Sequence, residues 1–418
     1  MIRYSASAPR GPFYGDSRMS KLSIADLKDF RNQRVLVRVD YNVPLDDNGA
    51  ITDDKRIKAT VPTLDYLVKG GAKIILCSHL GRPKGKRDPK QSLRPVAQRL
   101  AEILGRPVAF VDDCIGEKVD KTISIMQPGD IVLLENLRFY AEEEKNDPVF
   151  AEELARNADL YVNDAFGSAH RAHASTEGAA QIIKKRGGRC VAGFLMEKEL
   201  KYLGGALSSP ARPFVCILGG AKVSDKIAVI ENLLTQADAI LIGGAMAYTF
   251  LKTQGFGVGK SLVENDKLDL AKSLLDKAKG RIFLPADHLQ ASKPEAGAMT
   301  RLTDGTSIED GWYGVDIGPA TIRVYTREIA RAKTIVWNGP MGIFEVPEYS
   351  KGTFEVAKAV AANKAAISII GGGDSAKAVK KAGVDKQVTF VSTGGGASLE
   401  FLEGKVLPGV AALSEKQT

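Results

Sequence analysis

The 418-residue sequence lacks the marks of several protein classes. No stretch approaches the roughly 18 consecutive apolar residues of a membrane-spanning helix, and the 42 glycines follow no collagen period. Its four cysteines lie far apart without CxxC spacing, which argues against a zinc site or disulfide scaffold and favours a reducing cytoplasm. No long Lys/Arg run accompanies the net charge of +8, so we expect neither nucleic acid nor membrane as a partner.

Motifs of other enzyme classes are also missing: the protein-kinase HRD and DFG sets, HExxH and GxSxG. The segment GFGVGKS (255–261) resembles a Walker A loop, but it has three residues where the motif needs four. It also does not directly follow a predicted strand. We interpret it as a chance match.

Enough apolar mass is present, at 44% of residues, for a folded chain of two or three domains. Residues 1–18 differ, with three arginines against one acid and no apolar periodicity. We expect them to be a disordered extension ahead of Met19. An upstream start or cloning remnant, a transit-like peptide and an ordered arm all stay open as explanations.

Short runs rich in Val, Ile and Leu alternate with helical stretches along the rest of the chain. Consecutive apolar positions indicate strands buried on both faces, as in parallel sheets. About ten such strands favour two doubly wound α/β sheets over one. The runs are 35–39, 73–77, 130–134, 159–162, 214–218, 239–242, 281–284, 334–337, 366–370 and 388–391. Ser92 is expected to cap a helix that ends at Gly105, and another helix is expected over 375–381.

A helix over 196–207 is expected to join two domains, because a new series of strands starts directly after it. Gly204 and Gly205 would weaken it by roughly 1 kcal/mol each relative to alanine. The alternative is an ordinary surface helix within one domain.

The residues after the strands differ in kind between the two halves. In parallel sheets, ligands bind beyond the carboxyl ends of the strands. First-half ends repeatedly supply arginine, histidine and asparagine, which suit a small polyanion: DYN (40–42), SHLGR (78–82), ENLR (135–138) and NDAFGSAHR (163–171). A single such arginine is more often a surface ion pair, but their recurrence favours a site.

Second-half ends are rich in glycine, which lets backbone N–H groups approach phosphate oxygens: GGAK (219–222), GG (243–244), NGP (338–340), GGGD (371–374) and GGG (394–396). One Gly-Gly pair is usually a turn, whereas five such ends favour a nucleotide site. Asp374 follows three glycines and is a candidate ligand for phosphate-bound Mg²⁺.

These segments closely resemble the phosphoglycerate kinase family across residues 19–412. The matching motifs include RVDYNVP (38–44), SHLGRPKG (78–85), NDAFGSAHR (163–171), GGAKVSDK (219–226), WNGPMGIFE (337–345) and GGGDSAKA (371–378). The resemblance implies two Rossmann-like domains joined by a hinge helix. It implies reversible transfer between ATP and 3-phosphoglycerate, giving ADP and 1,3-bisphosphoglycerate, by a monomer with Mg²⁺ as MgATP or MgADP.

The domains expected from this resemblance are 19–195 for phosphoglycerate, 196–207 as the interdomain helix, 208–403 for nucleotide, and 404–418 returning to the first domain. The implied phosphoglycerate contacts are Asp40, Asn42, Arg56, His79, Arg82, Arg138 and Arg171, and the strand ends add Tyr41, Leu80 and Gly81. The implied nucleotide contacts are Lys222, Lys226, Glu345, Gly372, Gly373, Asp374 and Ser375, and the strand ends add Gly220, Ala221, Gly243 and Asn338.

Arg56 and Lys222 are the implied catalytic pair around the moving phosphoryl group, and Asp374 is the implied metal ligand. Residues 311–319 resemble the adenine side, where Gly314 is a contact and Tyr313 replaces a common methionine. The attacking carboxylate is ionised at pH 7, so no general base is needed.

Two other classes stay open. A non-catalytic nucleotide sensor could use the same scaffold, although Arg56, Lys222 and Asp374 are all present. A dehydrogenase would need GxGxxG directly after a strand, with an acid about 20 residues on. The glycine-bearing ends lack that layout.

Overall fold

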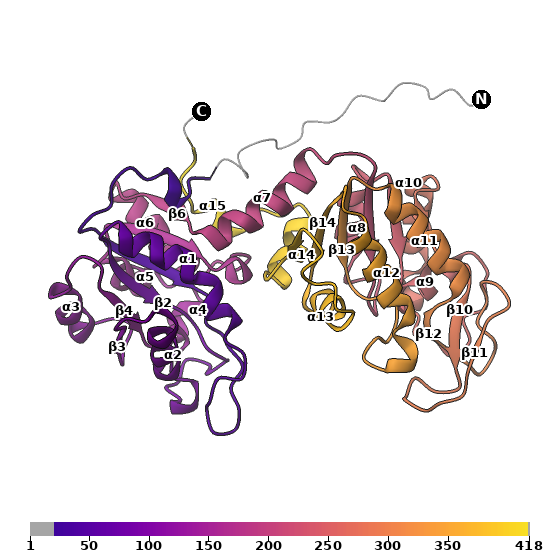
Figure 1. Ribbon diagram of the computed structural model, residues 1–418, viewed down its shortest axis with the longest axis horizontal. Helices are drawn as coiled ribbons and strands as arrows, with labels where there is room; N and C mark the ends of the chain where they lie inside the picture. Colours follow the sequence, from indigo (N-terminus) through magenta and orange to yellow (C-terminus); the bar gives the residue numbers. More distant parts are fainter. Residues whose placement is uncertain (1–20, 417–418) are drawn as a thin grey trace. The chain divides into compact units, whose positions relative to one another are not determined.

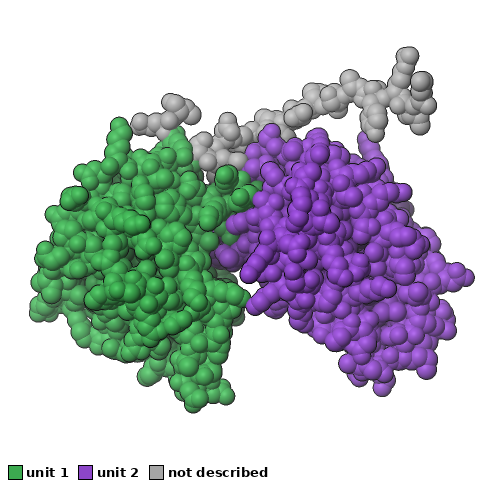
Figure 2. All heavy atoms as spheres, viewed as in Figure 1, with its two compact units in different colours: residues 1–165, 171–204, 408–418 green, residues 166–170, 205–407 purple. Residues whose placement is uncertain are grey.

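The structure, a computed structural model, describes residues 21–416, so the predicted extension 1–18 lies outside the described residues. The described residues form two compact units, which Figure 2 colours separately. Unit 1 contains 21–165, 171–204 and 408–416, and unit 2 contains 166–170 and 205–407.

Unit 1 is built on a six-stranded parallel sheet in the order β3-β4-β2-β1-β5-β6 (Figure 1). Its strands are β1 (Arg34–Val39), β2 (Lys73–Cys77), β3 (Ala109–Val111), β4 (Ile131–Leu134), β5 (Leu160–Asp164) and β6 (Cys190–Ala192). Nearly every strand residue of β1, β2, β4 and β5 is buried, as expected when helices cover both faces. β1 is central, with β2 on one side and β5 on the other. The chain therefore adds strands first on one side of β1 and later on the other side.

The helices of unit 1 are α1 (Lys55–Lys69), α2 (Arg94–Leu104), α3 (Glu117–Ser124), α4 (Ala141–Glu144), α5 (Pro148–Ala155), α6 (Ala179–Lys185), the start of α7 (Phe194–Ser208) and α15 (Pro408–Ala411). Single turns are η1 (Ile24–Asp26), η2 (Pro89–Gln91), η3 (Leu137–Phe139) and the π-helical η5 (Ala174–Gly178). The C-terminal residues join unit 1 through backbone bonds: Ser414 N donates to Cys190 O and Leu22 N donates to Ser414 O.

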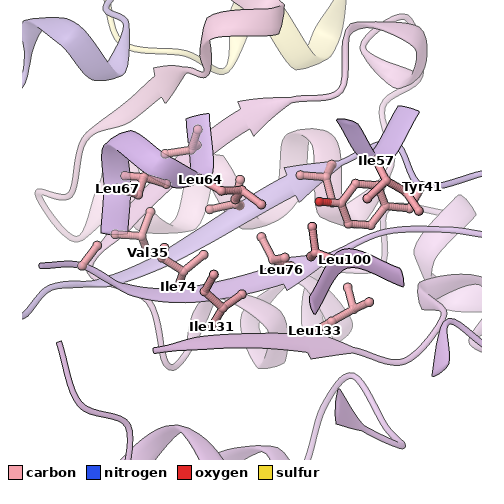
Figure 3. Close-up of a cluster of buried hydrophobic side chains, with 14 of the residues drawn as sticks. Val35, Tyr41, Ile57, Leu64, Leu67, Ile74, Leu76, Leu100, Ile131 and Leu133 are labelled. Atoms are coloured by element: carbon pink, nitrogen blue, oxygen red, sulfur yellow. The ribbon is translucent and has the colours of Figure 1, made fainter. Parts of the chain in front are cut away.

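The core of unit 1 lies between the sheet and two helices. Figure 3 shows their side chains pointing toward one another: Leu64 and Leu67 of α1, Leu100 of α2, and Val35, Ile74 and Ile131 of the strands. α2 ends at Gly105, as predicted, in a left-handed conformation with φ of 62°. Its beginning differs from the prediction, because Leu93 is the N-cap. Ser92 instead donates its hydroxyl to Glu135 and accepts a bond from Arg94 N.

Unit 2 repeats the arrangement with the parallel order β15-β14-β13-β7-β8-β9. β7 is central, with β8 and β13 on its two sides. The strands are β7 (Phe214–Leu218), β8 (Ala239–Ile242), β9 (Ile282–Phe283), β13 (Thr334–Asn338), β14 (Ile367–Gly371) and β15 (Phe390–Val391). The helices are α8 (Ile227–Leu234), α9 (Met246–Thr253), α10 (Leu268–Ala278), α11 (Pro319–Arg331), α12 (Lys351–Ala362), α13 (Gly373–Lys381) and α14 (Gly396–Leu402), with the turns η4 (Phe166–Ser168), η6 (Asn265–Lys267) and η7 (Pro347–Tyr349).

A small antiparallel sheet in unit 2 was not predicted. It has the order β11-β10-β12 and comprises β10 (His288–Ala291), β11 (Thr300–Leu302) and β12 (Tyr313–Ile317). β11 is exposed along its whole length, so it carries no apolar pattern. The predicted α/β class and both parallel sheets are confirmed, and each of the ten predicted runs overlaps a strand.

Candidate ligand sites at the strand ends

In unit 1, side chains that follow β1 and β4 and the backbone that follows β2 are joined by hydrogen bonds. Arg56 Nη1 donates to Asp40 Oδ2 over 2.7 Å. The backbone N of Gly81 donates to Asn42 Oδ1 over 2.9 Å, and Arg138 Nη1 donates to Gly81 O over 3.0 Å. Five of the predicted phosphoglycerate residues therefore lie at one edge of one sheet, where β1, β2 and β4 end.

Two predicted contacts have side chains that face the core instead. The Tyr41 ring is fully buried (Figure 3), and its hydroxyl is 2.8 Å from Thr60 Oγ1. Leu80 is 3% exposed, and both its N–H and its carbonyl bond to the Asn136 amide. Only their backbone could contact a ligand in this state. Arg82 and Arg171 are exposed.

The positive charges of this edge influence one another. Burial lowers the pKa of Arg138, the Glu144 carboxylate raises it, and the charges of Arg38 and Arg171 lower it. The pKa of His79 lies well below its ordinary value, first because of burial and then because of nearby positive groups. A neutral histidine among arginines is suited to contact an anion.

Arg38 is a residue that sequence reasoning missed. It lies in β1 and is 1% exposed, although it carries a charge. Its position inside an apolar strand was the available signal, because arginine is almost never fully buried unless it is paired.

In unit 2, a cavity of about 560 Å³ opens near the ends of β7, β8, β12 and β13. Five of the predicted nucleotide residues line it: Gly220, Ala221, Gly314, Glu345 and Asp374. Two glycine positions there leave no room for a side chain. A Cβ on Gly314 would lie 2.0 Å from the Tyr248 hydroxyl, and one on Gly244 would lie 2.5 Å from Gly220 O.

The other predicted nucleotide residues do not line this cavity but lie at or after the ends of strands β7, β8, β13 and β14 of the same sheet. Lys226 Nζ donates to Asn338 Oδ1, and Ser375 Oγ accepts from Gly339 N over 2.6 Å. Burial lowers the pKa of Lys226 to about 8, against the opposing charges of Asp225, Glu403 and Asp374. Of the rest, Lys222 and Gly373 are exposed, Gly372 is half-buried, and Gly243 is buried.

The segment 255–261 contributes to the cavity, although it is not a phosphate loop. Lys260 and Ser261 line the cavity, and Ser261 Oγ accepts a bond from Gly314 N over 2.9 Å. No helix starts directly after it, since η6 begins at Asn265. The Walker A reading is thus rejected. The rejected motif nevertheless held two lining residues that the sequence alone did not identify, as it also missed Tyr248, Leu262 and Pro294.

Few side chains of the described residues are placed to bind a metal ion. Within residues 21–416, no group of three or more His, Cys, Asp or Glu side chains is placed to hold a metal ion. Asp374 lies in the first turn of α13, its side chain is 59% exposed, and its Oδ1 is 3.1 Å from Lys377 Nζ. One carboxylate at a phosphate site fits Mg²⁺ that arrives on a nucleotide, because Mg²⁺ takes most ligands from phosphate and water there.

Among the described helices, none is long and apolar enough to cross a membrane.

Comparison with known proteins extends these observations. The sequence model described as "Phosphoglycerate kinase" matches residues 24–405. The phosphoglycerate kinase of Koribacter versatilis is 58% identical over 408 residues, covering 95% of this chain and 100% of its own. That of Acidobacterium capsulatum is 60% identical over 410 residues, with the same coverage.

Solved structures agree with the sequences. The structure of phosphoglycerate kinase from Coxiella burnetii superposes with a TM-score of 0.86 at 40% identity, covering 94% of this chain and 98% of that one. The enzyme from Pyrococcus horikoshii gives a TM-score of 0.79 at 35% identity with the same coverage.

Proposed function

Because the chain belongs to the phosphoglycerate kinase family, we propose below which residues bind each substrate and how the phosphoryl group moves. Its activity is phosphoryl transfer between ATP and phosphoglycerate. The family match over residues 24–405 is the observation that carries this conclusion. A non-catalytic sensor on the same scaffold is not favoured by relatives that are 58% and 60% identical.

The acceptor is the carboxylate of 3-phosphoglycerate, and the products are ADP and 1,3-bisphosphoglycerate. This carboxylate is ionised at pH 7, so it attacks the terminal phosphorus of ATP without a base. The reaction needs positioning and charge stabilisation, which agrees with strand ends that carry cations and glycines.

Unit 1 binds phosphoglycerate through the residues around Asp40, Asn42, His79 and Arg138. The bond from Gly81 N to Asn42 and the bond from Arg138 to Gly81 O support this role, because they hold three strand ends together before a ligand arrives. Such preorganisation reduces the conformational entropy that the protein loses when the ligand binds. The exposed Arg82 and Arg171 supply further positive charge.

Unit 2 binds the nucleotide in the 560 Å³ cavity. The base lies toward Tyr248 and Gly314, the ribose toward Glu345, and the phosphates toward Gly220 and Asp374. The glycine contacts support this assignment, since they let backbone approach the ligand where a side chain would block it.

Asp374 would be the protein ligand of Mg²⁺, which is supplied with the nucleotide as MgATP or MgADP. When bound, the ion neutralises charge on the phosphate oxygens. The exposed carboxylate of Asp374 and the first turn of α13 support this placement.

Arg56 and Lys222 flank the phosphoryl group during an in-line transfer. Because they belong to different units, the transfer requires closure about α7, which also excludes water. We expect small-angle scattering to show a smaller radius of gyration with both substrates than with neither. Identical profiles would contradict closure.

The protein works as a monomer in the cytoplasm in this proposal. All four cysteines are buried free thiols, which suits a reducing compartment. Analytical sedimentation tests the monomeric state, and cell fractionation tests the location in the cytoplasm.

A coupled assay tests the function. The purified chain is mixed with MgATP and 3-phosphoglycerate, and a dehydrogenase that reduces the acyl phosphate reports product as NADH oxidation. We expect turnover that needs both substrates, and turnover lower on the order of 10³ in an Arg56→Ala preparation made in parallel. Absence of turnover in the unmodified protein would reject the function.

A further inference from the structure

A buried network beside the phosphoglycerate site centres on Arg38. Its Nε donates to Ser175 Oγ over 2.8 Å, and its Nη1 donates to the carbonyl of Val39. Its Nη2 lies 2.9 Å from His79 Nδ1. Three bonds on three sides fix the guanidinium plane, so Arg38 has a single position relative to the His79 ring.

A buried carboxylate balances this charge through a hydroxyl. Glu143 is 1% exposed and accepts two bonds from Ser175, one from its N over 2.9 Å and one from its Oγ over 2.6 Å. Burial raises the pKa of Glu143 and the charge of Arg38 lowers it. The chain of bonds therefore runs from Glu143 through Ser175 and Arg38 to His79.

The direction of the last bond follows from chemistry. A guanidinium has five N–H donors and no acceptor. His79 Nδ1 must therefore accept the bond from Arg38, which it can do only without a proton. The proton of the neutral ring is then on Nε2.

The surroundings keep this ring neutral. Burial is the main cause that lowers the pKa of His79, followed by the positive groups of Arg38, Arg138, Arg56 and His173. Protonation at Nδ1 would also break the bond to Arg38. The ring thus offers one N–H donor, at Nε2, and no charge of its own.

We propose that Arg38 is a positioning residue for phosphoryl transfer: it holds His79 as the neutral Nε2–H tautomer, so that the imidazole donates a hydrogen bond to phosphoglycerate. This inference rests on the proposed function for the choice of ligand, whereas the tautomer is a property of the free protein. Arg38 itself is fully buried and acts through His79, while the exposed arginines contact the ligand.

Nitrogen NMR of the unmodified protein tests the tautomer directly. Protein labelled with ¹⁵N-histidine has four histidines, and an His79→Gln variant assigns the His79 signal. We expect Nε2 to be protonated and Nδ1 unprotonated from pH 6 to 8, with no titration. A proton on Nδ1, or a ring that becomes charged in this range, would overturn the proposal whether or not the enzyme turns over.

Steady-state kinetics of Arg38→Lys tests the consequence. Lysine keeps the charge but cannot make three bonds in one plane. We expect a mixture of His79 tautomers by NMR. We also expect the KM for phosphoglycerate to rise about tenfold, which is roughly the binding lost with one hydrogen bond to a charged group. The KM for ATP should stay as it is.

The matched control is Arg34→Lys on the same strand, because Arg34 is half-exposed and pairs with Asp159 at the surface. It should leave both the His79 signal and the two KM values unchanged. An equal rise in both KM values for Arg38→Lys would indicate a merely structural role and would contradict the proposal. If Arg38→Lys does not fold, the NMR result on the unmodified protein decides.

Discussion

Burial separates residues of the same predicted site into different roles. Arg56 has a side chain that is 42% exposed and pairs with Asp40, so a ligand can reach it. Tyr41 follows Asp40 directly, but its ring lies in the core. The segment after β1 therefore holds one side chain that is partly exposed, that of Asp40, and one that belongs to the core, that of Tyr41.

For Arg56→Ala, we expect kcat to fall on the order of 10³, because a cation that stabilises a transferring phosphoryl group contributes that much in related chemistry. The KM for ATP should change little, since Arg56 belongs to unit 1. Steady-state kinetics with both substrates measures this. Lys58→Ala on the same helix, with its side chain 56% exposed, is the control. An unchanged kcat in Arg56→Ala would remove it from the mechanism.

For Tyr41→Phe, we expect the free energy of unfolding to fall by about 1 kcal/mol, the value of one buried hydrogen bond. Thr60 Oγ1 still donates to Ile57 O, so no buried donor is left unpaired. Both KM values should stay as in the unmodified protein. Urea unfolding followed by circular dichroism gives the first quantity, and a raised KM for phosphoglycerate would show that Tyr41 contacts the ligand after all.

Strong local patterns made most elements predictable. β7 and β13 are buried throughout, and their apolar runs stood out. α7 extends from Phe194 to Ser208, slightly beyond the predicted 196–207. β3 and β6 were missed because three residues carry too little pattern, and β11 because it is exposed.

The candidate sites were predictable only where motif and strand end coincide. Asp40, Asn42 and Arg138 lie directly in such segments, and the structure joins their strand ends by hydrogen bonds. Tyr248 and Pro294 come from segments far apart in sequence and meet only after folding. Tyr248 lies within the segment IGGAMAYTFL (242–251), which resembles the family, whereas Pro294 lies outside the matching segments and had no local signal.

For Gly314→Ala in β12, we expect the KM for ATP to rise at least about tenfold, or about 1.4 kcal/mol of lost binding. The new Cβ would lie 2.0 Å from the Tyr248 hydroxyl and would force Tyr248 or β12 to move at the cavity wall. Thr300→Ala in β11 is the control, because it changes the same small sheet at a strand that is exposed along its whole length. An unaltered KM for ATP in Gly314→Ala would place the base elsewhere.

At the scale of the whole molecule, buried carboxyl groups in both units make the free energy of unfolding depend on pH. Burial raises the pKa of Asp164 to about 6 and that of Asp316 to about 7. Between about pH 4 and these values, the folded state binds more protons than the unfolded state. The stability that these two carboxyls contribute therefore falls as pH rises through this window, and their contribution is constant above it.

For Asp316→Asn, we expect the decline of unit 2 stability between pH 5 and pH 8 to shrink by roughly 2–3 kcal/mol. An asparagine oxygen can still accept the bond from Gly352 N. Both tryptophans, Trp312 and Trp337, belong to unit 2, so their fluorescence during urea unfolding reports on it. The exposed Asp310→Asn is the control, and an equal decline in both variants would contradict the assignment.

Neither unit is one continuous stretch of chain, which matters for synthesis. Unit 2 takes residues 166–170 from within unit 1, and unit 1 takes its last residues from 408 onward. A ribosome that has reached residue 407 has therefore delivered all of unit 2, while unit 1, begun first, still lacks its C-terminal piece. The half that starts the chain is the last to be completed, and a stop codon a few residues early damages unit 1 rather than unit 2, which directly precedes the lost residues in sequence.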